Sequence, residues 1–428
     1  MPDVSRPPFD VRDADRRHLW HPYTQHGLNE EPIAIVRAEG AYLYDDRGRA
    51  LFDAISSWWV TLHGHAQPEI AAAIAEQART LEQVIFAGFT HEPAARLAAA
   101  LSARAPRGLE RVFFSDDGST AVEVAVKIAF QYWINRGERR GVIVALENAY
   151  HGDTFGAMSV SARGLFTEPF AEQLFEVARL PDPVDGDVVA AFESLLAARG
   201  REIAALIVEP MLMGAGGMRM WPAKSLAALR ELSAHHGIPL IADEVLTGFG
   251  RTGPTFACEH AGVAPDLMCL SKGITGGFVP FGATLATEHL FESFRSDDRK
   301  RTLFHGHSYT ANPIACAAGI ASLALLDERS AERRRAIERA HRAAAARFKA
   351  LPRARNVRVL GTIIALELEA GERGYLSGVG QALRRFALDR GVSLRPLGDT
   401  VYLLPPYCAT DGDLAVAYDA IIEFAEAR

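Results

Sequence analysis

The sequence has 428 residues, of which 49% are hydrophobic and 23% charged, a balance typical of a globular protein with a large core. Its formal net charge of −7 is spread along the chain, which argues against a nucleic-acid or membrane-surface partner. No apolar run approaches the roughly 20 residues that span a bilayer, and residues 1–15 contain no signal-peptide core. We therefore expect a cytoplasmic protein.

The cysteine and histidine positions predict neither disulfides nor a metal site. The cysteines are Cys258, Cys269, Cys316 and Cys408, and no two of them form a CxxC pair. We expect them to be reduced thiols. His63 and His65 are close in sequence, but no third potential ligand follows at a suitable spacing. We therefore expect no bound metal.

The first part of the chain is an aromatic segment followed by short strands. Residues 18–25 are rich in histidine and aromatic side chains, and Pro22 stops any helix there. Alternating patterns predict strands over 33–37 and 41–45, joined as an antiparallel meander. The tryptophan pair at 58–59 follows. Local sequence is equally compatible with a core wedge and with an aromatic wall for a flat or cationic ligand.

The middle of the chain alternates between helical and strand patterns. Helices are predicted over 67–80, 93–105, 119–136, 188–199 and 223–236. Strands are predicted over 111–115, 141–146, 203–208, 238–242, 266–270 and 281–287. Helices that alternate with short buried strands predict an α/β fold with a mostly parallel sheet covered on both faces. Ligands bind such sheets at the carboxyl ends of the strands.

The last part of the chain predicts a smaller α+β domain. A helical, Ala- and Arg-rich stretch covers 314–350, and further helices are predicted over 376–390 and 411–427. Strands are predicted over 357–360, 362–368 and 400–404. We therefore divide the chain into an N-terminal segment at 1–60 that packs with the small domain, a large domain at 61–312, and a small domain at 313–428.

Chemically suggestive side chains follow several predicted strands. They are Asp116 to Ser119, Glu209, Asp243-Glu244 and Lys272. Lys272 ends an apolar strand and is followed by glycine, unlike the other lysines, Lys127, Lys224, Lys300 and Lys349. A desolvated lysine loses its proton readily and forms imines with aldehydes. Lys272 is therefore the candidate nucleophile, although a single lysine at a strand end is more often simply solvated.

Three neighbouring features fit a phosphorylated, planar ligand, and each has an ordinary structural alternative. Gly118 and Ser119 open an apolar helix, where free amides suit a phosphate, but Ser119 could equally be a helix cap. Asp243 ends a strand, where a ligand would lie, and a buried carboxylate is the usual partner that keeps a pyridine nitrogen protonated in pyridoxal phosphate enzymes. Tyr150 follows another strand and could stack on a planar ring or be a loop aromatic.

The combination resembles a known enzyme family. The motif Asp243-Glu244-Val245, continued by Gly248-Phe249-Gly250-Arg251-Thr252-Gly253, is followed by Ser271-Lys272-Gly273 at the family spacing. This resembles the class III aminotransferases, which have the fold of type I pyridoxal phosphate enzymes. The resemblance extends from about residue 16 to the C-terminus. It implies a pyridoxal 5′-phosphate-dependent aminotransferase with a central, mostly parallel sheet and a smaller α+β domain.

The resemblance also implies a role for each cofactor-binding residue. Lys272 is the implied catalytic residue, which bonds the cofactor aldehyde and moves the substrate proton. Asp243 pairs with the pyridine nitrogen, while Tyr150 and Val245 pack on the two ring faces. Gly118 and Ser119 bind the phosphate, together with Ser308 of the neighbouring subunit. A homodimer with shared active sites is therefore implied.

Other motifs imply the substrates. The segments at 18–24, 56–59 and 395–397 resemble the family branch that transfers an amino group to 8-amino-7-oxononanoate in biotin synthesis. The implied substrate-binding residues are Tyr23, Trp58, Trp59, Tyr150, Asp153, Arg251, Gly306 and Arg395. Arg395 would pair with a substrate carboxylate, and Arg251 would hold a polar network near Asp243.

The sequence leaves two amino donors open. The tryptophan pair favours S-adenosylmethionine, whereas His307 stands where many members have proline, so lysine is the alternative donor. A different ω-amino acid or diamine transaminase is the next alternative. A nucleotide-binding dehydrogenase is disfavoured, because the first predicted strand is followed by no GxGxxG turn.

Overall fold

The computed structural model describes residues 9–28, 30–369, 371 and 374–427, so the first eight residues of the predicted N-terminal segment lie outside the described part. Its large sheet has the strand order β4-β12-β11-β10-β7-β5-β6. The strands are β4 (Leu109–Ser115), β5 (Val142–Leu146), β6 (Val177–Leu180), β7 (Ile203–Val208), β10 (Leu240–Asp243), β11 (Leu267–Leu270) and β12 (Gly282–Thr287). Only β12 runs against its neighbours within this sheet, so the expected mostly parallel α/β sheet is confirmed.

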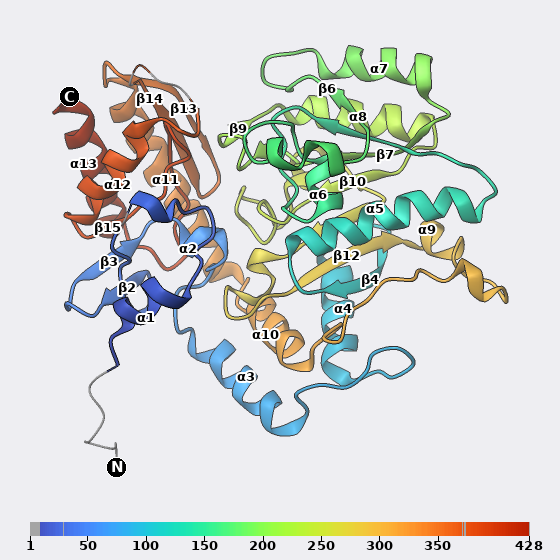
Figure 1. The fold of residues 1–428 in the computed structure, drawn as a ribbon, viewed down its shortest axis with the longest axis horizontal. Helices are drawn as coiled ribbons and strands as arrows, with labels where there is room; N and C mark the ends of the chain where they lie inside the picture. Colours follow the sequence, from blue (N-terminus) through green and yellow to red (C-terminus); the bar gives the residue numbers. More distant parts are fainter. Residues whose placement is uncertain (1–8, 29, 370, 372–373, 428) are drawn as a thin grey trace.

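Successive apolar side chains of the strands point to opposite faces of this sheet, and helices cover both faces (Figure 1). In β5, Ile143 and Ala145 pack with α5 (Gly118–Asn135), whereas Val144 and Leu146 belong to the core on the other face. The helices that contribute to that second core include α4 (Glu92–Arg104), α7 (Val188–Arg199), α8 (Ala223–His235) and α10 (Pro313–Ala324). Burial on both faces explains the continuous apolar runs of the central strands.

The two ends of the chain share a separate core, outside the large sheet. One small sheet pairs β1 (Ile35–Glu39), β2 (Tyr42–Asp45) and β3 (Ala50–Asp53) with β15 (Val392–Ser393). Another contains β13 (Ala354–Leu360), β14 (Ile363–Leu368) and β16 (Thr400–Leu403). The helices α11 (Glu328–Lys349), α12 (Gly378–Leu388) and α13 (Asp411–Glu426) pack with both sheets, which Figure 1 shows as blue strands beside red helices. The limits at residues 60 and 312 stay a prediction.

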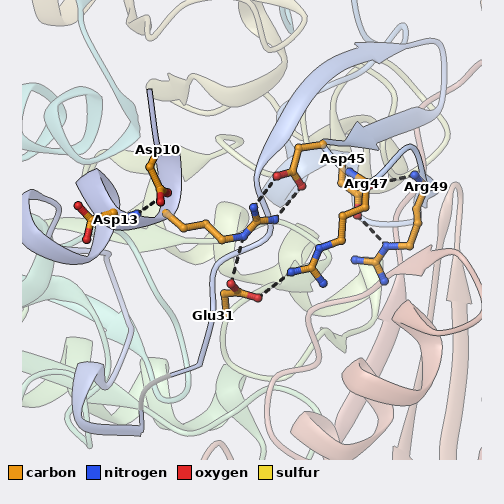
Figure 2. Close-up of polar contacts among 8 residues, drawn as sticks. Asp10, Asp13, Glu31, Asp45, Arg47 and Arg49 are labelled. Atoms are coloured by element: carbon orange, nitrogen blue, oxygen red, sulfur yellow. Dashed lines mark hydrogen bonds and ion pairs between the residues drawn. The ribbon is translucent and has the colours of Figure 1, made fainter. Parts of the chain in front are cut away.

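Charged side chains attach the first helix, α1 (Val11–His18), to the turn between β2 and β3 (Figure 2). Arg12 bonds both carboxylate oxygens of Asp46 and lies 3.3 Å from Glu31. Arg47 reaches the same Glu31 at 2.9 Å. The helix has no buried residue, so its apolar pattern could not predict it, and ion pairs hold it instead.

The tryptophan pair lies in an unexpected conformation. Ser56–Trp59 (α2) form one turn with φ angles of 51°, 45°, 71° and 76°. Left-handed turns of non-glycine residues cost about 1–2 kcal/mol per residue, so surrounding contacts must hold this one. The Ser56 hydroxyl donates to the Leu404 carbonyl, and the Trp59 indole donates to the Tyr402 hydroxyl.

The other helices are α3 (Pro68–Thr80), α6 (Phe155–Val160) and α9 (Glu288–Glu292), and a short ribbon joins β8 (Leu212–Met213) to β9 (Arg219–Met220). Within the described parts of the chain, none of the helices combines the length and apolar character that a membrane crossing requires. The same residues contain no cluster of three or more His, Cys, Asp or Glu that could hold a metal ion.

Candidate active site

A cavity of about 440 Å³ opens at the carboxyl ends of β4, β5, β7, β10 and β11. Among the predicted site residues, its lining includes Trp59, Gly118, Ser119, Tyr150, Asp243, Val245 and Lys272. These residues come from distant parts of the sequence, and the parallel strands bring them to one edge of the sheet. The cavity is therefore the candidate active site.

Lys272 lies at the end of β11, in a strained conformation. Its φ is 30°, in the left-handed region that non-glycine residues rarely adopt. The Nζ atom lies 5.2 Å from the centre of the Trp59 ring. Burial lowers the pKa of Lys272, while the charges of Asp243, Glu209 and Asp117 raise it. A lowered pKa provides more of the neutral amine, which is the nucleophilic form.

Asp243 is a buried carboxylate held in place by a histidine. Its Oδ2 lies 2.7 Å from His151 Nδ1, and its Oδ1 accepts the Val245 amide at 3.1 Å. His151 is itself buried, and the Ser161 hydroxyl accepts its amide at 2.8 Å. These contacts fix the carboxylate at the cavity wall, where it can hold a positive charge on a ligand.

The start of α5 has the features of an anion site. Asp117 caps the helix by accepting the Thr120 amide at 2.8 Å, so Ser119 is not the cap. The amides of Gly118 and Ser119 precede the first intrahelical bond, from Ala121 to Asp117, and form the positive end of the helix dipole. A Cβ on Gly152 would lie 2.1 Å from Ser119 Oγ, so glycine is required for this close approach. Phosphate suits such a site.

Comparison with known proteins identifies the family. The family model described as aminotransferase class III matches residues 23–424. The chain belongs to the class III aminotransferases.

Relatives of this aminotransferase are similar over nearly their whole length. It is 50% identical to the adenosylmethionine-8-amino-7-oxononanoate aminotransferase of Synechococcus elongatus, over 95% of this chain and 98% of that protein. The crystal structure of the Methanocaldococcus jannaschii protein of the same name is 32% identical, with a TM-score of 0.94 and coverage of 97% and 98%. A PLP-bound amine transaminase from an uncultivated Pseudomonas species is also 32% identical, with a TM-score of 0.86 and coverage of 96% and 98%.

Class III aminotransferases use pyridoxal 5′-phosphate, and the cavity fits that cofactor. The amides of Gly118 and Ser119 offer donors to a phosphate, and Gly152 packs closely against Ser119 because it has no side chain. Asp243 offers a fixed carboxylate, and Lys272 offers a partly desolvated amine in the same cavity. The expected fold-type I architecture, the aminotransferase activity and the cofactor class are thus confirmed at the level of the family.

The other predicted substrate residues lie beside the main cavity. Asp153 lines a second cavity of about 210 Å³, which shares Tyr150 and Gly152 with the first. The Tyr23 hydroxyl donates to Asp153. Tyr23 also packs edge-on against Trp58, with ring centres 5.5 Å apart. Arg395 completes this group, since its guanidinium carbon lies 4.5 Å from the centre of the Trp58 ring.

Arg251 was expected to hold a polar network near Asp243, and its hydrogen bonds go to main-chain carbonyls. It is fully buried and lines neither described cavity. Its guanidinium donates to the carbonyls of Pro405 at 2.9 Å, Trp59 at 3.2 Å and Thr61 at 3.3 Å. Burial lowers the pKa of Arg251 to about 10. These contacts are with the main chain around the left-handed turn, so the arrangement does not favour a direct contact between Arg251 and a substrate.

Gly306 and Ser308 lie on an exposed segment and line neither described cavity. The Ser308 carbonyl accepts the side-chain amide of Gln83. The family resemblance assigns Ser308 to the site of a neighbouring subunit, and a single chain does not test that assignment.

Some cavity residues had no predicted role. Glu209 was noted as a polar side chain after a strand but was given no role, and His151, which follows Tyr150 directly, was not predicted. Strand-end position was the available signal for both. Phe166 and Tyr375 line the second cavity, where their ring centres lie 4.7 Å apart. Both lie in irregular segments, and sequence pattern offers no signal for such contacts.

Proposed function

We propose that this aminotransferase converts 8-amino-7-oxononanoate to 7,8-diaminononanoate in biotin synthesis, with S-adenosylmethionine as the amino donor. The observation that carries the proposal is the 50% identity to the Synechococcus elongatus relative over nearly the full length of both proteins. Conservation of that extent across a whole enzyme supports a shared acceptor.

Lys272 is the proposed catalytic residue. Bound pyridoxal phosphate supplies a ring that takes up the electron pair released when a C–H bond of the substrate breaks. Lys272 holds the cofactor covalently and carries the proton from and to the substrate carbon, a role that typically contributes about 10²–10⁴-fold. The cavity position of its Nζ beside Trp59 and its lowered pKa support this role.

The proposed cofactor contacts use the cavity walls. Asp243, held by His151, keeps a proton on the pyridine nitrogen. Tyr150 and Val245 pack on the ring faces. The amides of Gly118 and Ser119, with the Ser119 hydroxyl, bind the phosphate. The position of these two amides before the first intrahelical bond supports this role.

The proposed substrate contacts extend from the main cavity, which Trp59 lines, to the second cavity, which Asp153 lines. Arg395 binds the acceptor carboxylate through its planar fork of donors. Trp58, Trp59, Tyr23 and Asp153 line the substrate path, supported by the Tyr23–Asp153 bond and the Tyr23–Trp58 packing. Arg251 is proposed to act indirectly, through the turn that carries the tryptophans.

A homodimer is proposed, with Gly306 and Ser308 of one chain reaching the site of the other. Two joined segments, 82–89 and 304–312, support it, because hydrogen bonds hold them together and both expose large apolar side chains. The exposed side chains are Ile85, Phe89, Phe304 and Tyr309. Sedimentation velocity tests the dimer, and a monomer at micromolar concentration would refute it. Cytoplasmic location stays a prediction that cell fractionation tests.

Absorbance tests the central role of Lys272. Protein loaded with pyridoxal phosphate should absorb visible light, and Lys272→Ala should lose this absorbance while keeping the far-ultraviolet circular dichroism of the wild type. Lys224→Ala is the matched control, because Lys224 lies on α8 and does not line the described cavity. A wild-type protein that takes up no cofactor would refute the proposal.

The donor is tested separately from the acceptor. S-adenosylmethionine, added alone to loaded enzyme, should remove the visible absorbance, whereas L-lysine should leave it unchanged. The opposite result would make lysine the donor and retain the acceptor. The second candidate is a broader ω-transaminase, favoured by the 30% identity and TM-score of 0.91 to an (S)-enantioselective ω-transaminase from Thermomicrobium roseum. Turnover of simple ω-amines without 8-amino-7-oxononanoate turnover would support that candidate.

A further inference from the structure

Glu209 is a buried acidic residue that none of the proposed roles uses. It follows β7 directly, is 5% exposed, and lines the main cavity. A buried carboxylate is costly unless it is hydrogen-bonded or paired with charge. Its contacts therefore indicate what holds it there.

The carboxylate of Glu209 joins two walls of the cavity. Its Oε1 accepts the Tyr150 amide, and its Oε2 accepts the Gly214 amide, both at 2.9 Å. Tyr150 belongs to the loop after β5, whereas Gly214 follows β8 and precedes Ala215, which also lines the cavity. Two acceptor oxygens are needed for this arrangement. A glutamine would turn its own N–H₂ group towards one of the two amides.

Charged groups face Glu209 from three other strand ends. They are His151 after β5, Asp243 at the end of β10 and Lys272 after β11, and Asp117 before α5 also faces Lys272. Burial raises the pKa of Glu209 to about 7, with His151 lowering it and Asp243 raising it. The charge of Glu209 in turn raises the pKa of Lys272, against the effect of burial.

We propose that Glu209 is a positioning residue for transamination, which holds the Tyr150 and Gly214 loops across the cavity and favours the protonated form of the Lys272 nitrogen. The inference rests on the proposed role of Lys272. Asp243 shares the electrostatic effect on Lys272, whereas the two amide bonds that join the Tyr150 and Gly214 loops are made by Glu209. Glu209 acts through its charge and its two amide bonds rather than by bonding Lys272 directly.

Glu209→Gln separates charge from size. Cofactor-loaded enzyme is titrated above pH 7, where Glu209 is charged in the wild type. The pH midpoint of the change in visible absorbance should be about 1 pH unit lower in Glu209→Gln than in the wild type. In cofactor-free enzyme, mass-spectrometric labelling with an amine-reactive reagent should show Lys272 reacting at correspondingly lower pH. The other lysines of the same chain serve as internal references.

Glu244→Gln is the matched control. Glu244 is a fully buried carboxylate after β10 that accepts from Thr247, Ala257 and Cys258, and it does not line the main cavity. Its substitution should lower thermal stability and leave the titration midpoint and the Lys272 labelling profile unchanged. A wild-type midpoint and labelling profile in Glu209→Gln would overturn the inference.

Glu209→Asp tests the same idea if Glu209→Gln does not fold. The charge remains, so the midpoint should stay near that of the wild type. The shorter side chain reaches only one of the two amides, so cofactor release should accelerate about 10-fold, and wild-type release would overturn the positioning role. If wild-type enzyme has no Lys272-dependent absorbance, the proposed function fails instead, and the labelling of cofactor-free protein still tests the Glu209 charge.

Discussion

Replacing Arg251 tests whether this residue holds the turn that carries Trp58 and Trp59. Arg251→Met keeps a long apolar stem and removes the guanidinium that donates to three buried carbonyls. Hydrogen bonds from a charged donor contribute about 1.5–3 kcal/mol each, or about 6 kcal/mol together. Burial, which lowers the pKa of Arg251 to about 10, opposes the charged guanidinium and offsets part of this gain. The net loss expected from Arg251→Met is about 3 kcal/mol.

Thermal melting measures this loss. A chain of 428 residues has an unfolding entropy of about 0.9 kcal/mol per kelvin, so Tm should fall by about 3 °C if the whole chain melts together. Arg334→Met is the matched control, because Arg334 also lies over the Tyr407 ring but donates only to the Gly253 carbonyl. Its expected fall is about 1 °C. Protein concentration and scan rate are held constant, because both affect Tm in an oligomer.

Kinetics separate the indirect role of Arg251 from a direct one. A displaced turn should lower kcat/KM for donor and acceptor alike, since Trp59 lies beside Lys272. An unchanged Tm, combined with a raised KM for one substrate alone, would refute the role of Arg251 in holding the turn and would favour a direct substrate contact.

Further predictions concern pH, the phosphate cradle and the carboxylate site. Burial lowers the pKa of His341 to about 3, so the unfolded chain binds this proton more tightly. The contribution of His341 to stability is thus complete above about pH 6.5 and falls by ~1.4 kcal/mol per unit as pH drops towards 3. His341→Gln should flatten that part of the stability profile in urea titrations, and the exposed His235→Gln should not. Gly152→Ala should weaken pyridoxal phosphate binding at least about 10-fold by fluorescence titration, because its Cβ meets Ser119 Oγ; wild-type affinity would contradict the cradle. Arg395→Ala should raise KM for the keto acid about 10–100-fold with little change in kcat, and an unchanged KM would mean that another group binds the carboxylate.

Local pattern was enough to place most of the strands and helices of the large sheet. Buried strands such as β7 are continuous apolar runs, and a parallel sheet covered on both faces requires that pattern. Local pattern did not predict the elements that polar contacts hold in place. α1 buries no residue, so it has no apolar pattern. β6 is a short strand at the edge of the sheet, and its three positions before Leu180 are only partly buried, so its pattern is too short to predict a strand.

The sequence by itself determined which chemistry this protein can perform. Lys272, Asp243 and Gly118-Ser119 each follow a strand, and a parallel sheet brings the ends of its strands to one edge, so their order along the chain already implied one site. Tertiary structure alone decided how the surrounding residues act. The turn at Ser56–Trp59 is left-handed because buried contacts from Arg251, Leu404 and Tyr402 outweigh its local cost. Arg251, His151 and Glu209 acquire their partners through contacts distant in sequence, which no local pattern encodes.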